Sequence, residues 1–223
     1  EGHKVIVKPS NHLSTQMQEK PAVNDKFSLF ATKMKQDGLP QLVISIFEHY
    51  YRQLVSGETG FISNKVAEPV HSLPMYDDLD ERFESYGKAA LEKAVIIKLN
   101  GGLGTSMGLQ GPKSLLPVKN GLSFMDITVN QIMQLRERYN ARLPLVLMNS
   151  FSTNEQSLEA LTQFPTFTQE TPVAFLQHKT PKIWKSDFTP AEWPEEPEKE
   201  WCPPGHGDLY AAIDSSGTLD KLL

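Results

Sequence analysis

The sequence contains a single cysteine, Cys202, among its 223 residues. One thiol excludes an internal disulfide and a zinc site built from several cysteines. It also makes a reducing compartment, namely the cytoplasm, the expected location. The longest apolar run falls far short of the roughly 20 residues that a membrane-spanning helix needs. The polar N-terminus lacks the apolar core of a signal peptide, so we expect no membrane association.

The chain also lacks a basic excess. It carries 22 lysine and arginine residues against 27 aspartate and glutamate residues, which gives a formal net charge of -5. A nucleic-acid-binding protein usually presents a basic face, so we expect no nucleic-acid partner. The acidic balance still permits an anionic small-molecule ligand, because backbone N–H groups bind phosphate without cationic side chains.

Hydrophobic periodicity divides the chain into three regions. Residues 1–25 show no sustained period and are expected to form a flexible tail. Residues 26–93 are predicted to be an N-terminal helical region, with helices near 27–37, 40–56 and 84–93. The second helix carries an apolar stripe at helical spacing, which consists of Leu42, Ile46, Phe47, Tyr50 and Leu54.

The third region, residues 94–223, has a different pattern in which short apolar runs alternate with helical segments. The runs at 94–99, 145–150 and 173–177 are almost continuously apolar, which is typical of strands buried on both faces. Alternating strands and helices predict βαβ units and a mainly parallel sheet. The predicted fold class is therefore α/β.

Two of the intervening helices have capping boxes at their N-termini. Ser123 is predicted to pair with Asp126, and Thr153 with Gln156. The third strand is followed by a long, proline-rich connection over residues 178–204. A connection of this length inside a domain is usually functional or disordered.

A glycine-rich stretch, KLNGGLGTSMGLQGPKSLL at residues 98–116, begins within the first predicted strand and continues beyond it. Ligands of parallel sheets bind outside the carboxyl ends of the strands. The other two predicted strands also end in polar residues, Asn149–Ser150 and Gln177. We therefore expect a binding site where these three strand ends meet.

The stretch matches neither of the two common phosphate-binding loops. A dinucleotide fingerprint would place its third glycine at position 107, whereas the glycine comes one residue later, at Gly108. A Walker A loop would place glycine directly before the lysine, whereas Pro112 precedes Lys113 and removes one backbone donor. A nicotinamide dehydrogenase is therefore disfavoured as a function.

The chemistry of the stretch still indicates a nucleotide. Glycines at 101, 102 and 104 allow the backbone to approach a ligand closely. The N–H groups from Gly104 to Ser106 are predicted to form a nest for phosphates. Gly111–Pro112 is expected to direct Lys113 back across the loop, where its ammonium group would meet a phosphoryl group. The alternative is that the glycines only form a tight turn and that Lys113 is a surface charge.

Together these motifs resemble those of the eukaryotic-type UDP-glucose pyrophosphorylase family, the UTP–glucose-1-phosphate uridylyltransferases. The resemblance rests on the glycine-rich stretch and on NGLSFMDITVNQI, LVLMNSFST, QHKTPK and PPGHGDLY, which begin at residues 120, 145, 177 and 203. It extends over residues 57–223. It implies a Rossmann-like nucleotidyltransferase fold (GT-A-like), with N-terminal helices and a mixed, mainly parallel sheet flanked by helices.

The resemblance implies a role for each matching residue. Lys113 would be the catalytic lysine that neutralises the nucleotide phosphates during attack. Gln177 would hydrogen-bond the uracil edge, and His206 would approach the phosphates and the sugar. The other implied nucleotide-binding residues are Leu99, Asn100, Gly101, Gly102, Gly104, Thr105, Met148 and Gly205.

Several neighbouring polar residues have plainer interpretations. Asp208 is interpreted as the cap of the helix that follows it rather than as a metal ligand. His178, Lys179 and Lys182 are interpreted as surface or loop-anchoring residues. We expect no metal ligand within this chain.

The implied reaction joins UTP and glucose 1-phosphate to give UDP-glucose and pyrophosphate, reversibly, by in-line attack of the sugar phosphate on the α-phosphorus. Magnesium is the implied cofactor and would bridge phosphate oxygens. The resemblance places its aspartate ligand, most sugar contacts and a C-terminal domain beyond Leu223. We therefore expect residues 94–223 to be the first part of a catalytic domain, which holds the nucleotide half of the site and is inactive alone.

Two alternatives stay open. One is a uridylyltransferase that uses a different sugar phosphate, such as galactose 1-phosphate or an amino-sugar phosphate. The other is a non-catalytic nucleotide-binding or assembly module that keeps the glycine-rich stretch without the metal-binding aspartate. An oligomeric assembly is compatible with each of these functions.

Overall fold

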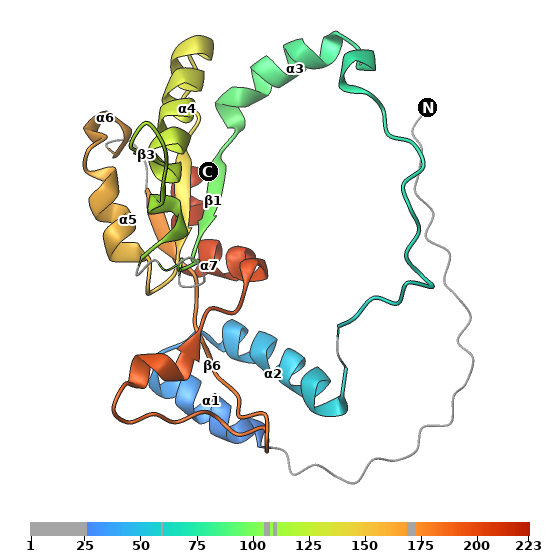
Figure 1. The fold of residues 1–223 in the computed structure, drawn as a ribbon, viewed down its shortest axis with the longest axis vertical. Coiled ribbons are helices and arrows are strands. Elements are labelled where there is room, and N and C mark those ends of the chain that lie inside the picture. The colour runs from blue at the N-terminus through green and yellow to red at the C-terminus, as the bar shows by residue number, and fades with distance from the viewer. Residues whose placement is uncertain (1–25, 59, 105–107, 109–110, 169–172) are drawn as a thin grey trace.

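A computed structural model of the chain describes residues 26–58, 60–104, 108, 111–168 and 173–223 (Figure 1). The tail predicted over residues 1–25 lies outside the described residues. Among the described residues, no helix combines the length and the apolar character that crossing a membrane requires.

The centre of the fold is a three-stranded parallel sheet, as the sequence predicts. Its strands are β1 (Ile96–Asn100), β4 (Leu145–Asn149) and β5 (Ala174–Leu176), in the order β1-β4-β5. The register pairs Asn100 with Asn149, so the carboxyl ends of β1 and β4 lie level. The three predicted strands are confirmed, and their polar ends lie at one edge of the sheet.

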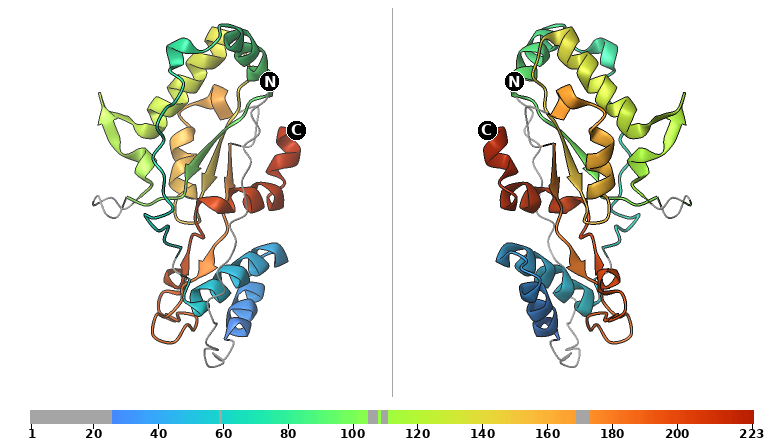
Figure 2. Two further views of the ribbon diagram at one scale, coloured as in Figure 1. Left: turned by 90° about the vertical axis from the view of Figure 1, so that its right-hand side faces the viewer. Right: turned by 90° about the vertical axis from the view of Figure 1, so that its left-hand side faces the viewer.

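Helices cover both faces of this sheet (Figure 2). On one face lie α4 (Phe124–Tyr139), α5 (Asn154–Leu161) and α6 (Pro165–Thr168), and on the other lie α7 (Leu209–Ser215) and α8 (Thr218–Leu222). Leu145 and Leu147 pack with α4 and α5, whereas Val146 and Met148 pack with Ala212 of α7. Successive strand side chains point to opposite faces, so a strand covered on both sides is apolar at every position.

One of the two predicted capping boxes is confirmed. The Asp126 N–H donates to Ser123 Oγ at 3.1 Å, and the Ser123 N–H donates to Asp126 Oδ2 at 2.8 Å. The box predicted at Thr153 is wrong, because in the described structure its side chain makes no capping hydrogen bond to α5. The Thr153 hydroxyl donates instead to the Asn100 carbonyl at the end of β1, at 2.8 Å. The hydroxyl oxygen accepts the Ser150 N–H at 3.0 Å, so a backbone donor of the preceding turn takes the place of the helix N–H groups.

Short elements complete the domain around the sheet. Strands β2 (Pro117–Lys119) and β3 (Leu122–Ser123) form an antiparallel hairpin. Its turn residues Asn120 and Gly121 both have positive φ, 52° and 75°, as a two-residue hairpin requires. The 3-10 helices are η1 (Tyr76–Asp78), η2 (Leu91–Lys93), η4 (Lys113–Leu115), η5 (Pro197–Glu200) and η6 (His206–Asp208).

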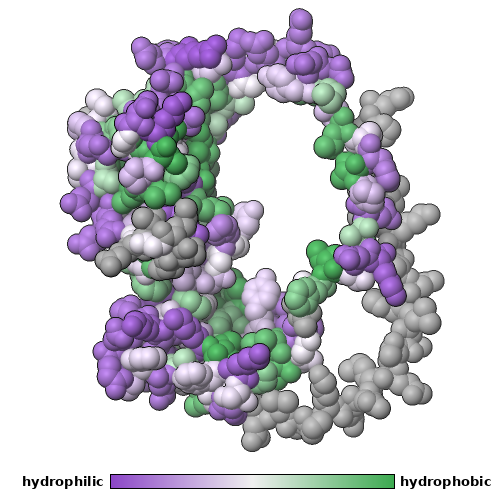
Figure 3. Space-filling model, viewed as in Figure 1, coloured by the Kyte–Doolittle hydropathy of each residue, from purple (hydrophilic) through white to green (hydrophobic). Residues whose placement is uncertain are grey.

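The segment that leads into the sheet stands away from the rest of the protein (Figures 1 and 3). Every residue from 60 to 90 is exposed, and this segment, which we call the exposed arc, includes α3 (Arg82–Ala90). The predicted helix over 84–93 is confirmed as α3 followed by η2. Along the arc apolar side chains face solvent, and Phe61 is 90% exposed. A Glu84–Lys88 ion pair of 2.6 Å links successive turns of α3.

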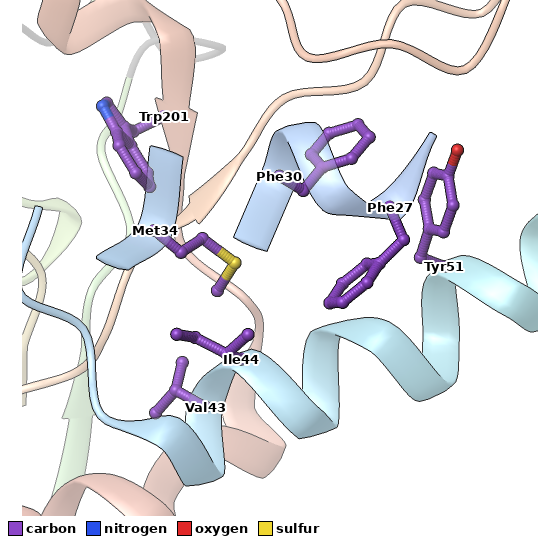
Figure 4. Close-up of a cluster of buried hydrophobic side chains, with 7 residues drawn as sticks. All are labelled: Phe27, Phe30, Met34, Val43, Ile44, Tyr51 and Trp201. Carbon is purple, nitrogen blue, oxygen red and sulfur yellow. The ribbon is translucent and has the colours of Figure 1, made fainter. Parts of the chain in front are cut away.

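The N-terminal helices α1 (Phe27–Gln36) and α2 (Gln41–Ser56) pack against the long connection that follows β5 (Figure 4). Within that connection, β6 (Thr180–Pro181) pairs with β7 (Trp201–Cys202). Their common core consists of Phe27, Phe30, Met34, Val43, Ile44, Tyr51 and Trp201. The boundary predicted between residues 93 and 94 stays a prediction.

Polar contacts reinforce the attachment of α1 to the connection. Lys33 forms an ion pair with Glu200, and Lys179 forms one with Asp37 at 2.9 Å. The Lys179 ammonium group also lies 4.7 Å from the centre of the Trp201 ring, within the range of a cation–π interaction. Residues far apart in the sequence therefore hold the two helices in place.

Most of the apolar stripe identified on the second helix is exposed rather than buried. Leu42, Ile46, Tyr50 and Leu54 are all exposed, whereas the buried residues of α2 are Val43, Ile44 and Tyr51. The helix has two adjacent apolar rows, and Phe47 belongs to the buried one. Contact with the aromatic residues of α1 decides between the rows, and that contact is invisible to helical periodicity alone.

Candidate functional site

A buried polar network fixes the ends of β1 and β4. Asn100 Nδ2 donates to Asn149 Oδ1 at 2.7 Å and lies 2.8 Å from Ser157 Oγ of α5. Asn149 Nδ2 donates in turn to Asn154 Oδ1 at 3.0 Å, and the Ser157 hydroxyl donates to the Thr153 carbonyl at 2.6 Å. Asn100 and Asn149 are both buried. Satisfied polar networks of this kind hold a backbone rigidly, so the strand ends form a fixed platform.

Gln177 lies on this platform next to Gly101. Its backbone N–H donates to the Asn149 carbonyl at 2.8 Å, and the residue is buried. A Cβ atom at position 101 would collide with the side-chain nitrogen of Gln177. Glycine at position 101 therefore lets the carboxamide approach closely, and a larger residue would make the Gln177 side chain shift.

Backbone hydrogen bonds between the two ends of the glycine-rich stretch place Lys113 beside the end of β1. The Lys113 N–H donates to the Gly102 carbonyl at 3.1 Å, and the Gly104 N–H donates to the Gly111 carbonyl at 3.0 Å. The Lys113 chain runs along Gly102, where a Cβ atom would lie 3.9 Å from Lys113 Cδ. Thr105 and most of the predicted phosphate nest lie outside the described residues.

A cavity of about 380 Å³ opens at this point, beside the carboxyl end of β1. It is lined by Lys98, Leu99, Asn100, Gly102, Lys113, Ser114, Leu116, Phe124 and His206. Five of the predicted residues therefore share one cavity. Two lysines contribute to its wall, and none of the described residues that line it is acidic. The cavity is suited to an anionic ligand.

Lys98 is a lining residue that the sequence motifs do not single out. It lies on β1, two residues before Asn100, and is half-buried. The signal was present, because a lysine interrupts an otherwise apolar strand predicted to be covered on both faces. A charged residue in such a strand needs a polar partner or a ligand.

The remaining predicted residues lie around this cavity. Met148 is fully buried among Val146, Phe175 and Ala212 between the sheet and α7, and it is not among the residues that line the cavity. Gly205 has a φ of 110° and directly precedes η6, which carries His206. The roles of Met148 and Gly205 in nucleotide binding stay predictions.

The interpretation of Asp208 as a helix cap is wrong, whereas the loop-anchoring interpretation of His178 is confirmed. In the described structure Asp208 makes no capping hydrogen bond to α7, and its carboxylate accepts the His178 N–H at 2.6 Å. The His178 ring is 11% exposed and places Nδ1 2.9 Å from Asp208 Oδ1 and Nε2 3.0 Å from Ser215 Oγ. His178 therefore anchors its segment through a partly buried polar cluster with Asp208 and Ser215.

The described residues do not provide a set of side-chain ligands for magnesium. Among the described residues there is no group of three or more His, Cys, Asp and Glu side chains able to hold a metal ion. The cavity wall offers lysine and histidine, whereas magnesium prefers carboxylate and phosphate oxygens.

Comparisons with known proteins agree with the sequence motifs. A family model described as UTP--glucose-1-phosphate uridylyltransferase matches residues 44–223. The protein of that name from Hordeum vulgare is 40% identical over 163 residues, which is 72% of this chain and 33% of the relative. Its counterpart from Solanum tuberosum is 38% identical over 174 residues, which is 76% of this chain and 36% of the relative. The chain therefore spans about a third of the length of these relatives.

Solved structures show the same relationship in three dimensions. The UDP-glucose phosphorylase of Trypanosoma brucei aligns with a TM-score of 0.80 and 41% identity, covering 88% of this chain and 42% of that one. A point mutant of the UDP-glucose pyrophosphorylase of Leishmania major, solved in complex with UDP-glucose, aligns with a TM-score of 0.79 and 36% identity. That alignment covers 90% of this chain and 42% of the other.

Proposed function

The chain belongs to the UTP–glucose-1-phosphate uridylyltransferase family, and from this premise we propose that it carries the nucleotide-binding half of an enzyme that makes UDP-glucose and pyrophosphate from UTP and glucose 1-phosphate. The observation that carries the proposal is the cavity beside β1, whose lysines and lack of described acidic lining residues suit a polyphosphate. The complex of the Leishmania major relative with UDP-glucose supports the same class of ligand.

In the proposed reaction two polyanions must meet, so most of the catalysis is neutralisation of charge and positioning. Lys113 is held at the mouth of the loop by its backbone hydrogen bond to Gly102. From there its ammonium group would neutralise the phosphates of UTP while the sugar phosphate attacks the α-phosphorus. His206 lines the same cavity and would contact the phosphates or the sugar from the opposite segment.

The base would be read by Gln177. Its carboxamide offers both a donor and an acceptor, which complement the alternating donor and acceptor of a uracil edge. Cytosine reverses part of this pattern and would leave buried polar groups unpaired, at a cost of about 1–3 kcal/mol each. Because Gln177 is buried and packed on Gly101, the carboxamide has little freedom to adapt to the wrong base.

We propose that magnesium binds together with the nucleotide phosphates. The described residues do not form a carboxylate site for it. We also propose a reducing compartment, the cytoplasm, for which the single free thiol of Cys202 is the support.

The proposal is tested first by binding. Calorimetry of the 223-residue chain with UTP, CTP and ATP should show a preference for UTP, and equal affinities or an absence of binding would contradict it. The transfer reaction needs a complete enzyme, because the chain covers 33% of the Hordeum vulgare relative. Residues 44–223 can replace the matching stretch of that relative, and the chimera should then form UDP-glucose.

The chimera also distinguishes the alternatives. A preference for another sugar 1-phosphate in the chimera would point to sugar-specific residues within this stretch. A chimera that folds and binds UTP but forms no UDP-glucose would favour a non-catalytic nucleotide-binding module. A chimera with Lys113→Ala is the matched control, because it should bind uridine and lose most of the turnover.

A further inference from the structure

We propose that Asp208 is a positioning residue, which holds the segment that presents Gln177 against the segment that presents His206. The proposal rests on the proposed function, since it assumes that both segments contact one nucleotide. Two contacts from the Asp208 carboxylate to His178 hold the segments together, and we call this pair of contacts the clamp. Oδ2 accepts the backbone N–H of His178 at 2.6 Å, and Oδ1 lies 2.9 Å from Nδ1 of the same residue.

The burial of Asp208 makes these contacts strong. Its side chain is 6% exposed, so water competes little for the carboxylate. Hydrogen bonds to an ionised acceptor are stronger than neutral ones, and a low local dielectric strengthens them further. Asp208 precedes α7, where an aspartate would ordinarily cap the helix. Its carboxylate turns instead to a neighbouring segment, so the contact between segments takes the place of the cap.

The two clamped segments lead directly to the cavity. Gln177 immediately precedes His178 and is fixed to the sheet through the Asn149 carbonyl. His206 begins the 3-10 turn that ends at Asp208, and the Asp208 N–H donates back to the Gly205 carbonyl at 3.3 Å. Movement of Asp208 relative to His178 would therefore change the spacing between the base-reading carboxamide and the imidazole on the cavity wall.

The backbone and ring contacts of His178 have separable roles. The ring joins Asp208 to α7, because Nε2 lies 3.0 Å from Ser215 Oγ. The backbone N–H fixes the main chain next to Gln177. A variant without the ring keeps the backbone contact, whereas a variant in which residue 208 has no side-chain acceptor loses both. Only the second should alter the recognition of the base.

The test measures the preference for UTP over CTP by calorimetry on the full 223-residue chain. Asp208→Ala should lower that preference about tenfold or more, the expected effect of losing one buried polar contact. Asp208→Asn should restore it, because the amide oxygen still accepts the His178 N–H. His178→Ala and Ser215→Ala should leave the preference within about twofold, although they lower the melting temperature.

The outcomes separate positioning from stability. A folded Asp208→Ala chain with the wild-type preference would overturn the clamp, as would an equal loss of preference in His178→Ala. If Asp208→Ala does not fold, Asp208→Ser takes its place, because the shorter hydroxyl side chain stays polar but cannot reach His178. A wild-type chain without any preference for UTP would refute the proposed function instead, so the two failures are distinguishable.

Discussion

The hydroxyl of Thr153 donates a hydrogen bond to the backbone carbonyl of Asn100 at 2.8 Å, which ties the turn after β4 to the end of β1. The same oxygen accepts the Ser150 N–H at 3.0 Å, and Thr153 is fully buried. One side chain therefore satisfies two backbone groups at the edge of the sheet where the cavity opens.

Thr153→Val should lower the free energy of unfolding by about 1–3 kcal/mol, because it leaves the Asn100 carbonyl and the Ser150 N–H buried without a partner. The substitution keeps the shape of the side chain, so the loss reports the hydroxyl. Urea unfolding measures the effect. Thr153→Ser is the control and should lose less, since it retains the hydroxyl. Equal stability of the valine variant and the wild type would show that these groups find other partners.

Removal of either lysine from the cavity should weaken binding of the phosphates and spare the nucleoside. Lys113→Ala and Lys98→Met should each raise the dissociation constant of UTP by about tenfold or more, because hydrogen bonds to charged groups contribute about 1.5–3 kcal/mol. The dissociation constant of uridine should change less than about twofold. Lys119→Met, on the exposed hairpin, is the control. An equal loss of uridine binding would show that these lysines contact the nucleoside rather than the phosphates.

Gly101→Ala should disturb the site more than Gly102→Ala. At position 101 the added methyl group meets the Gln177 carboxamide, which must move, whereas at 102 the nearest atom is Lys113 Cδ at 3.9 Å, an ordinary contact. We expect Gly101→Ala to reduce the preference for UTP by displacing the carboxamide, and to cost little stability because the end of the Gln177 side chain can shift. Thermal unfolding and calorimetry measure both effects, and similar behaviour of the two variants would contradict the close packing.

Acid should weaken the attachment of the N-terminal helices. Two hydrogen bonds to the Glu200 carboxylate lower its pKa below the ordinary value of 4.5. The larger effect comes from Lys33, and the second comes from the Trp193 N–H at 2.6 Å. A carboxyl group whose pKa is lower in the folded state stabilises the fold at pH values above its unfolded-state pKa. That stabilisation is lost as the pH falls through the lowered, folded-state pKa. Between pH 7 and pH 3 the wild type should therefore lose more stability than Glu200→Gln.

Urea midpoints at the two pH values measure this difference. Glu198→Gln, an exposed glutamate on the same 3-10 turn, is the matched control and should follow the wild type. Identical pH dependence of Glu200→Gln and the wild type would show that the Lys33 pair adds nothing to the attachment.

The sequence predicts the sheet well because burial on both faces leaves a direct mark. Short, almost continuously apolar runs such as those at β1, β4 and β5 are characteristic of covered strands, and the Ser123–Asp126 box involves residues close in the chain. The face of α2 and the partner of Thr153 depend on contacts between distant segments. Two apolar rows on α2 are equally compatible with periodicity, and packing against α1 and Trp201 selects one.

In the candidate site, too, the sequence reveals residues of a local motif but not contacts between distant residues. Gly101, Gly102 and Lys113 belong to one continuous motif, so the sequence identifies them together. The clamp between His178 and Asp208 joins residues separated by 30 positions. An aspartate before a helix commonly caps that helix, and this local role conceals the contact with a distant backbone. Lys98 was concealed by its place in a strand, although its charge was an available signal.

The exposed arc has a consequence for how the chain is joined together. Its residues from 60 to 90 are all exposed, so the arc connects α2 to β1 without adding buried contacts to the core around Trp201. Closure of such a loop costs entropy that grows only with the logarithm of its length, by about 0.6 kcal/mol per doubling. The length of the arc can therefore vary widely while the helices remain docked.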